Sequence, residues 1–82
     1  MIVDLYSKAS CVQCTFQKKK LDLLGIPYVE HRIDQDPEAL AVVQAAGFLQ
    51  APVVIASGAF SWSGYSPDKS TALAQHLKEQ TP

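Results

Sequence analysis

Two cysteines three residues apart are the side chains of this sequence best suited to do chemistry. They stand as Cys11-Val12-Gln13-Cys14, and they are the only cysteines among the 82 residues. Thiols at this spacing can close into a disulfide and open again, which moves two electrons. A ring over so few residues restricts the unfolded chain very little, which disfavours a purely structural disulfide. The pair therefore predicts a dithiol–disulfide oxidoreductase.

A metal site is the other common use of paired cysteines. A structural zinc site needs four ligands, and neither His31 nor His76 stands at a zinc-finger spacing from the pair. We therefore expect no metal ligands in this chain. A four-thiolate iron–sulfur cluster would need a dimer or external thiols. A non-catalytic iron–sulfur or binding module is the alternative from a different functional class.

The elements around the pair favour a reactive thiolate. Residues 2–6 are short, apolar and typical of a strand, and a helix follows from about Cys11 to Leu24, with Ser10 as its expected N-cap. Unpaired N–H groups and a partial positive charge at the start of such a helix favour a thiolate over a thiol. Gly25 and Pro27 are expected to end the helix. The side chains expected to pack inward are Phe16, Leu21, Leu23 and Leu24.

The rest of the chain predicts the thioredoxin fold. We expect a strand at residues 28–33, a helix from Asp36-Pro37-Glu38 to Gly47, a strand at 53–55, a turn at 57–58, a strand at 60–62 and a last helix from Pro67. The βαβ half makes the first two strands parallel, and the short connection makes the last two a hairpin. The α/β arrangement is βαβαββα, a four-stranded mixed sheet with three helices in one domain over residues 1–82. Other expected inward residues are Tyr28, Val29, Ile33, Leu40, Val43, Ala46, Leu73 and Leu77.

Composition excludes several functions. The net charge is −1 with no basic stripe, so nucleic acid is not an expected partner. No apolar stretch reaches the length of a membrane span, and the start of the chain lacks the pattern of a signal peptide. We therefore expect a cytoplasmic protein with no membrane partner, where a disulfide is transient and catalytic.

Three motifs together resemble those of the NrdH-type redoxins. They are Cys11-Val12-Gln13-Cys14, Gln50-Ala51-Pro52-Val53-Val54 and Trp62-Ser63-Gly64-Tyr65-Ser66-Pro67. The resemblance implies a glutaredoxin-like protein that takes electrons from NADPH through thioredoxin reductase and passes them to the large subunit of class Ib ribonucleotide reductase. It implies no bound cofactor beyond the Cys11–Cys14 disulfide, and we expect a monomer.

The two cysteines are expected to have different roles. Cys11 is the N-terminal and more exposed member, so we expect it to attack a substrate disulfide. Cys14 lies about one helical turn inside and would resolve the mixed disulfide. Lys8 is a candidate for favouring the thiolate through its charge, and a solvated loop lysine is the alternative.

The resemblance also implies a partner-binding surface. It implies a cis Ala51–Pro52 bond that faces the dithiol and presents the Ala51 backbone to an extended substrate. The other expected contact residues are Val12, Gln13, Trp62, Ser63, Gly64 and Tyr65. Of these, Trp62 is expected to pack one ring face and leave an edge for a partner. Phe48 and Leu49 are expected to be packing residues.

The last motif departs from the family pattern at two positions. The family usually has Phe and Arg where this chain has Tyr65 and Ser66. Tyrosine keeps the ring, whereas serine removes a fixed charge. A glutathione-dependent glutaredoxin is the enzymatic alternative. Such proteins usually show Cys-Pro-Tyr-Cys, Thr-Val-Pro and a Gly-Gly-Asp-type segment, and this chain has none of the three.

Overall fold

The elements follow the order βαβαββα that the sequence predicts. A computed structural model describes residues 2–57 and 60–80. Its elements are β1 (Val3–Ser7), α1 (Val12–Leu23), β2 (Val29–Arg32), α2 (Pro37–Ala45), β3 (Val53–Ala56), β4 (Phe60–Ser63) and α3 (Pro67–Gln80). Most strand and helix bounds lie within one or two residues of the expectation, while part of the expected 57–58 turn lies outside the described residues. The fold is thioredoxin-like.

The strands form one mixed sheet in the order β2-β1-β3-β4. β1 pairs in parallel with β2, as a βαβ crossover requires, and antiparallel with β3. β3 and β4 pair antiparallel, which confirms the predicted hairpin. The two central strands, β1 and β3, border the loops that contain Cys11 and Pro52.

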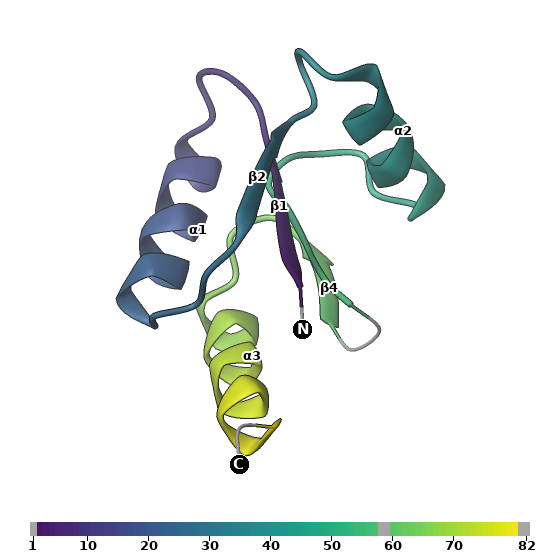
Figure 1. Cartoon of the computed structure of the whole chain (residues 1–82). Coiled ribbons are helices and arrows are strands. Elements are labelled where there is room, and N and C mark those ends of the chain that lie inside the picture. The colour runs from purple at the N-terminus through teal and green to yellow at the C-terminus, as the bar shows by residue number, and fades with distance from the viewer. Residues whose placement is uncertain (1, 58–59, 81–82) are drawn as a thin grey trace.

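Alternating side chains divide the core between the two faces of the sheet. In β1, Val3 and Leu5 point to one face and Tyr6 to the other. The first face packs against α1 and α3 and holds Leu21, Trp62 and Leu73, while the second packs against α2. Figure 1 shows α1 and α3 on one side of the sheet and α2 on the other.

The N-cap of helix α1 lies one residue later than expected. Ser10 is not the N-cap. It adopts a φ of 55°, in the left-handed region, and Cys11 caps the helix with extended backbone. The Cys11 sulfur accepts a hydrogen bond from the Cys14 N–H at 3.1 Å, which is the contact that a capping side chain normally makes. The residue that caps the helix is therefore also one of the two cysteines of the redox pair.

The inward face of α1 differs from the expected one. Phe16 is 50% exposed and Leu23 is 83% exposed, so neither packs in the core as the sequence suggested. The buried positions are Cys14, Gln17 and Leu21, which repeat at helical spacing along one side. The expectation failed because it chose positions by hydrophobicity, whereas the crossing of α1 over the sheet decides which side is covered.

Helix α2 shows the same kind of difference. Asp36 caps it by accepting from the Glu38 N–H at 3.0 Å, as predicted. The buried residues are Ala39 and Val43, whereas Leu40 (37%) and Ala46 are exposed. Val29 is also exposed, at 53%, since β2 is an edge strand. Of the other inward predictions, Leu24, Tyr28, Ile33 and Leu77 pack against the core and Leu73 is fully buried.

None of the helices described over residues 2–57 and 60–80 is long and apolar enough to cross a membrane.

Candidate active site

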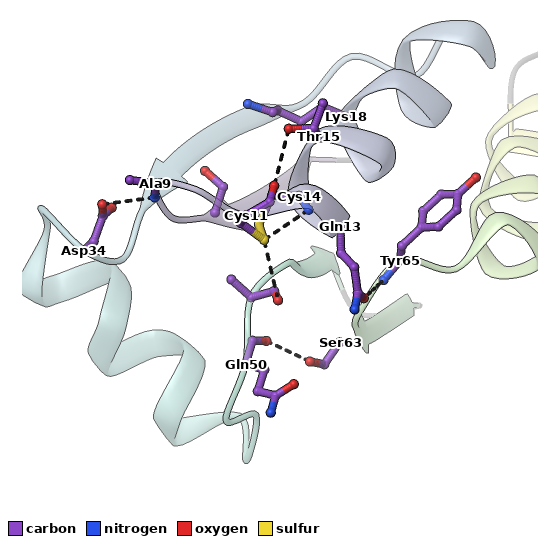
Figure 2. The surroundings of a disulfide bond; sticks show 12 residues. Ala9, Cys11, Gln13, Cys14, Thr15, Lys18, Asp34, Gln50, Ser63 and Tyr65 are labelled. Atoms are coloured by element: carbon purple, nitrogen blue, oxygen red, sulfur yellow. Dashed lines mark hydrogen bonds between the residues drawn. A yellow bond between two sulfur atoms is a disulfide. The ribbon is translucent and has the colours of Figure 1, made fainter.

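The redox pair lies where the chain leaves β1 and enters α1. Cys11 and Cys14 form a disulfide, with 5.2 Å between their Cα atoms. The two residues are exposed to different extents: Cys11 is half-buried, while Cys14 is 2% exposed. Figure 2 shows the pair at the start of the helix, opposite the loop that precedes β3. A molecule that approaches this site meets Cys11 first.

The backbone favours negative charge on Cys11 once the disulfide is reduced. The N–H of Cys14 points at the Cys11 sulfur, and the helix dipole places partial positive charge at the same end. Hydrogen bonds to a charged form stabilise it, so this geometry lowers the cost of a Cys11 thiolate. Cys14 lies inside the first turn and is buried, which suits it to attack a bond made to Cys11 and not an outside molecule.

The loop opposite the pair contains the cis peptide bond implied by the motif. The Ala51–Pro52 bond is cis, and the Ala51 carbonyl oxygen lies 4.0 Å from the Cys11 sulfur. The loop is tied to the β4 end by two hydrogen bonds, from Ser63 Oγ to the Gln50 carbonyl and from the Gly64 N–H to the Pro52 carbonyl, both 2.8 Å. The backbone of Ala51 is thereby held beside the reactive sulfur.

Exposed apolar side chains lie on the segments that flank the redox pair in the fold. Val12 is 68% exposed, and Leu49, in the loop before Pro52, is 94% exposed. The expectation that Leu49 packs inside is therefore wrong, while Phe48 does pack against the α2-side core. Tyr65 is 38% exposed, with its ring centroid 5.9 Å from that of Phe16. Apolar groups left in water beside a reactive sulfur are typical of a docking surface.

Trp62 does not belong to that surface. It is 2% exposed and lies in the core between the sheet and helices α1 and α3. Its Nε1 donates to Gln17 Oε1 at 3.1 Å, so neither a ring edge nor the indole N–H is left for a partner. The prediction of a shared role was wrong because the one polar atom of the ring finds a partner inside the protein.

Gln13 and Gln17 both organise the site through hydrogen bonds. The sequence analysis partly anticipated the role of Gln13 and missed that of Gln17. Gln13, predicted as a contact residue, uses its Oε1 to accept the Tyr65 N–H at 3.1 Å. Gln17 was not singled out, yet its side chain is fully buried. The sequence did contain a signal for this burial. Gln17 lies three positions after Cys14 and on the same side of α1 as Leu21.

Lys8 borders the reactive sulfur. Two shallow hollows flank Cys11, and Lys8 lines both. The first also contains Ser10, Thr15 and Lys18, and the second contains Gln13, Gln50 and Ala51. The structure thus places Lys8 beside Cys11, and its role in favouring the thiolate stays a prediction.

Metal ligands do not gather anywhere in the described part of the chain. Among residues 2–57 and 60–80, no group of three or more His, Cys, Asp or Glu side chains could hold a metal ion. His31 instead stacks on Tyr6 with ring centroids 4.9 Å apart, and its Nε2 lies 2.8 Å from Asp4 Oδ1.

Comparison with known proteins agrees with this geometry. The glutaredoxin family model matches residues 3–60. The glutaredoxin-like protein NrdH of Escherichia coli K12 is 41% identical over 68 residues, 83% of each chain, and NrdH of Lactococcus lactis subsp. cremoris is 40% identical over 73 residues, 89% of this chain and all of that one. The chain belongs to the NrdH glutaredoxin-like proteins. The solved structure of the NrdH-redoxin from E. coli superposes with a TM-score of 0.83 at 40% identity, over 89% of this chain and 95% of that one.

Ser66, one of the two departures from the usual NrdH motif, has a clear structural role here. Its Oγ accepts from the Lys69 N–H at 3.2 Å, so serine caps helix α3 directly before Pro67. Its own N–H donates to Gln17 Oε1 at 3.1 Å. The Ser66 cap and the buried amide of Gln17 therefore hold the motif in place without the charge that an arginine would add.

Glu30 links β2 to the two elements that flank the redox loop. One carboxylate oxygen accepts from Ser7 Oγ at 2.6 Å and from Lys18 Nζ at 3.1 Å. The Ser7 hydroxyl first, and then the Lys18 ammonium, hold the pKa of Glu30 below its ordinary value of 4.5, against the opposite effect of partial burial. A lowered pKa in the folded protein means that ionised Glu30 stabilises the fold above pH 4.5.

Glu30→Gln should therefore make folding less sensitive to acid. In the wild type this part of the stability is lost as the pH falls through the lowered pKa, and the variant lacks it at every pH. The partly exposed site limits the effect to about 1 kcal/mol. Urea unfolding at pH 7 and pH 3 measures the difference, with the exposed Glu79→Gln as control. Equal pH dependence in wild type and Glu30→Gln would contradict the assignment.

Proposed function

We propose that this protein is a dithiol electron donor that thioredoxin reductase recharges and that delivers electrons to class Ib ribonucleotide reductase. The observation that carries the proposal is the unequal exposure of the two cysteine residues. Cys11 is half-buried and accepts the Cys14 N–H at the helix start, while Cys14 is 2% exposed. This is the arrangement required of an attacking thiol and a resolving thiol.

The reaction proceeds in two thiol–disulfide exchanges. The Cys11 thiolate attacks one sulfur of the substrate disulfide, which forms a mixed disulfide and releases the other substrate sulfur as a thiolate that takes up a proton. The Cys14 thiol then loses its proton and attacks the Cys11 sulfur, which forms the Cys11–Cys14 disulfide and releases the second substrate thiol. The substrate gains two electrons from the protein and two protons, one from the Cys14 thiol and one from the solvent, which received the Cys11 proton when the thiolate formed.

Positive charge beside Cys11 supports the first step. The helix N-terminus and the Lys8 side chain both favour the thiolate. Lys8 therefore tunes the attacking group without contacting the bond that breaks. NADPH supplies the two electrons that restore the dithiol, through the reductase.

The surface around Cys11 fits an extended, partly apolar segment of a protein partner. The Ala51 backbone lies beside the sulfur and is free of the sheet, so a substrate strand can pair with it. Val12, Leu49 and Tyr65 offer exposed apolar area, and Gln13, Ser63 and Gly64 shape the adjoining edge. The role of Trp62 is to support this surface from the core.

Two alternatives predict different behaviour. The first is a glutathione-dependent glutaredoxin: the glutaredoxin family model matches this chain, but the chain lacks the motifs with which those proteins hold the tripeptide. The E. coli NrdH-redoxin, at 40% identity, is a glutaredoxin-like protein with a thioredoxin-like activity profile, which supports the reductase over glutathione. An iron–sulfur carrier would need a second chain or external thiols.

The test is NADPH consumption during reduction of a protein disulfide. One reaction contains thioredoxin reductase, and the other contains glutathione with glutathione reductase. We expect efficient turnover with the first only, followed by transfer to class Ib ribonucleotide reductase, measured as deoxyribonucleotide formed. Turnover with glutathione alone would establish a true glutaredoxin, and a coloured protein with acid-labile sulfide would favour the carrier.

A further inference from the structure

Gln17 is a polar side chain buried in the core between α1, β4 and α3. It stands on α1 one turn after Cys14 and is fully buried. Glutamine is mostly an exposed residue, and buried polar groups are normally hydrogen-bonded. Its Nε2 donates to Ser70 Oγ at 2.7 Å, and its Oε1 accepts from Trp62 Nε1 and from the Ser66 N–H, both at 3.1 Å. One side chain thus joins α1 to β4 and to the start of α3.

Two glutamines one helical turn apart hold consecutive backbone groups of the segment before α3. The Tyr65 N–H donates to Gln13 Oε1, and the Ser66 N–H donates to Gln17 Oε1, each at 3.1 Å. Gln13 is exposed, so a partner can touch it directly. Gln17 is buried, so it can affect a partner only through residues 65–66.

Residues 65–66 control part of the exposed surface beside the redox pair. Tyr65 is 38% exposed and lies against Phe16 of α1. In Figure 2 the Tyr65 backbone meets the Gln13 side chain, next to the helix turn that contains both cysteines. If the Ser66 N–H lost its acceptor, this segment would keep the outer bond to Gln13 and lose the buried one.

We propose that Gln17 is a positioning residue for partner recognition, which holds residues 65–66 and the Tyr65 ring in the arrangement that a protein partner binds. The proposal rests on the proposed function, since it takes docking of a protein reductase on this face as the event that Gln17 supports. Among residues 2–57 and 60–80, none of the Gln17 hydrogen bonds ends on a sulfur. Gln17 therefore acts on docking and not on the exchange chemistry.

Gln17→Met is the sharpest test, because methionine keeps the length of the side chain and removes all three hydrogen bonds. With NADPH and thioredoxin reductase, KM for the variant should rise by about tenfold while kcat stays at the wild-type value, which is the signature of lost binding. The reduced variant should react with 2-hydroxyethyl disulfide at the wild-type rate, since that small molecule needs no docking surface. Amide exchange of Ser66 should become faster.

Matched variants separate positioning from simple destabilisation. Gln44→Met makes the same change at an exposed position of α2 and should leave KM unchanged. Gln17→Asn draws the oxygen back by one methylene and should raise KM. This variant supplies a second measurement of KM if Gln17→Met does not fold.

Several results would overturn the proposal. An unchanged KM in folded Gln17→Met or Gln17→Asn would show that the network serves stability alone. An equal loss with the reductase and with the small disulfide would place Gln17 in the exchange chemistry. Wild-type protein that does not turn over with the reductase would instead contradict the proposed function. The same variants would then be compared by insulin reduction with dithiothreitol as reductant, where a slower rate confined to Gln17→Met and Gln17→Asn supports the proposal and equal rates reject it.

Discussion

Cys14→Ser should yield a protein that attacks a disulfide once and then stalls while covalently bound to its substrate. The variant keeps Cys11 with its hydrogen bond from the residue-14 N–H, so the first exchange still occurs. The second exchange needs the buried thiol, which serine cannot replace as a nucleophile toward sulfur. Turnover should fall to the background rate, and non-reducing gels with mass spectrometry should show a one-to-one adduct through Cys11.

Cys11→Ser is the matched control for that experiment. It removes the half-exposed attacking sulfur and leaves only Cys14, which is 2% exposed. Turnover should again fall to background, but with no adduct. Adduct formation through Cys14 in this variant, at the rate seen for Cys14→Ser, would reverse the assigned roles. Equal thermal stability of the two reduced variants would show that the difference is chemical.

Leu21→Ala should lower the free energy of unfolding by about 2–5 kcal/mol, because it leaves a cavity in the fully buried core between α1 and the sheet. A domain of 82 residues has a total stability of roughly 4–12 kcal/mol. The loss should therefore lower the melting temperature by at least about 8 °C. Calorimetry and urea unfolding measure this loss, and the slope of the unfolding free energy against urea concentration should stay unchanged.

Leu23→Ala makes the same change two residues further along the same helix, where the side chain is 83% exposed. Its effect on the free energy of unfolding should stay within about 0.5 kcal/mol. The pair separates the observed inward face of α1 from the one that hydrophobicity alone suggested. Similar losses in both variants would mean that α1 is rotated relative to the sheet from the orientation described here.

The chemistry and the order of elements were available from the sequence. Two cysteines at one spacing limit the reaction to two-electron exchange, and their place between a strand and a helix provides the helix N-terminus. Turn residues such as Gly25 and Asp36 stop and start helices through local backbone preferences, and both were predicted correctly. Motif resemblance supplied the cis bond before Pro52, which local preference alone would not have predicted.

The side chains that face inward were decided by tertiary structure. Gln17, Phe16 and Leu23 follow one another closely on α1, and hydrophobicity ranks them in the wrong order for burial. Glutamine is buried because Trp62 and Ser66, distant in sequence, bring donors to its amide oxygen. Burial of a polar group depends on such partners, and their positions are set only when β4 and α3 pack on α1.

The sequence by itself therefore determined the family, the redox-active cysteine pair and the elements that surround the two sulfurs, because those depend on residue type and on neighbours along the chain. Only the tertiary structure decided that Trp62 is internal and that Leu49 is external. Each of these depends on contacts between segments far apart in sequence. Such contacts form when the helices pack on the two faces of the sheet, and no local pattern contains them.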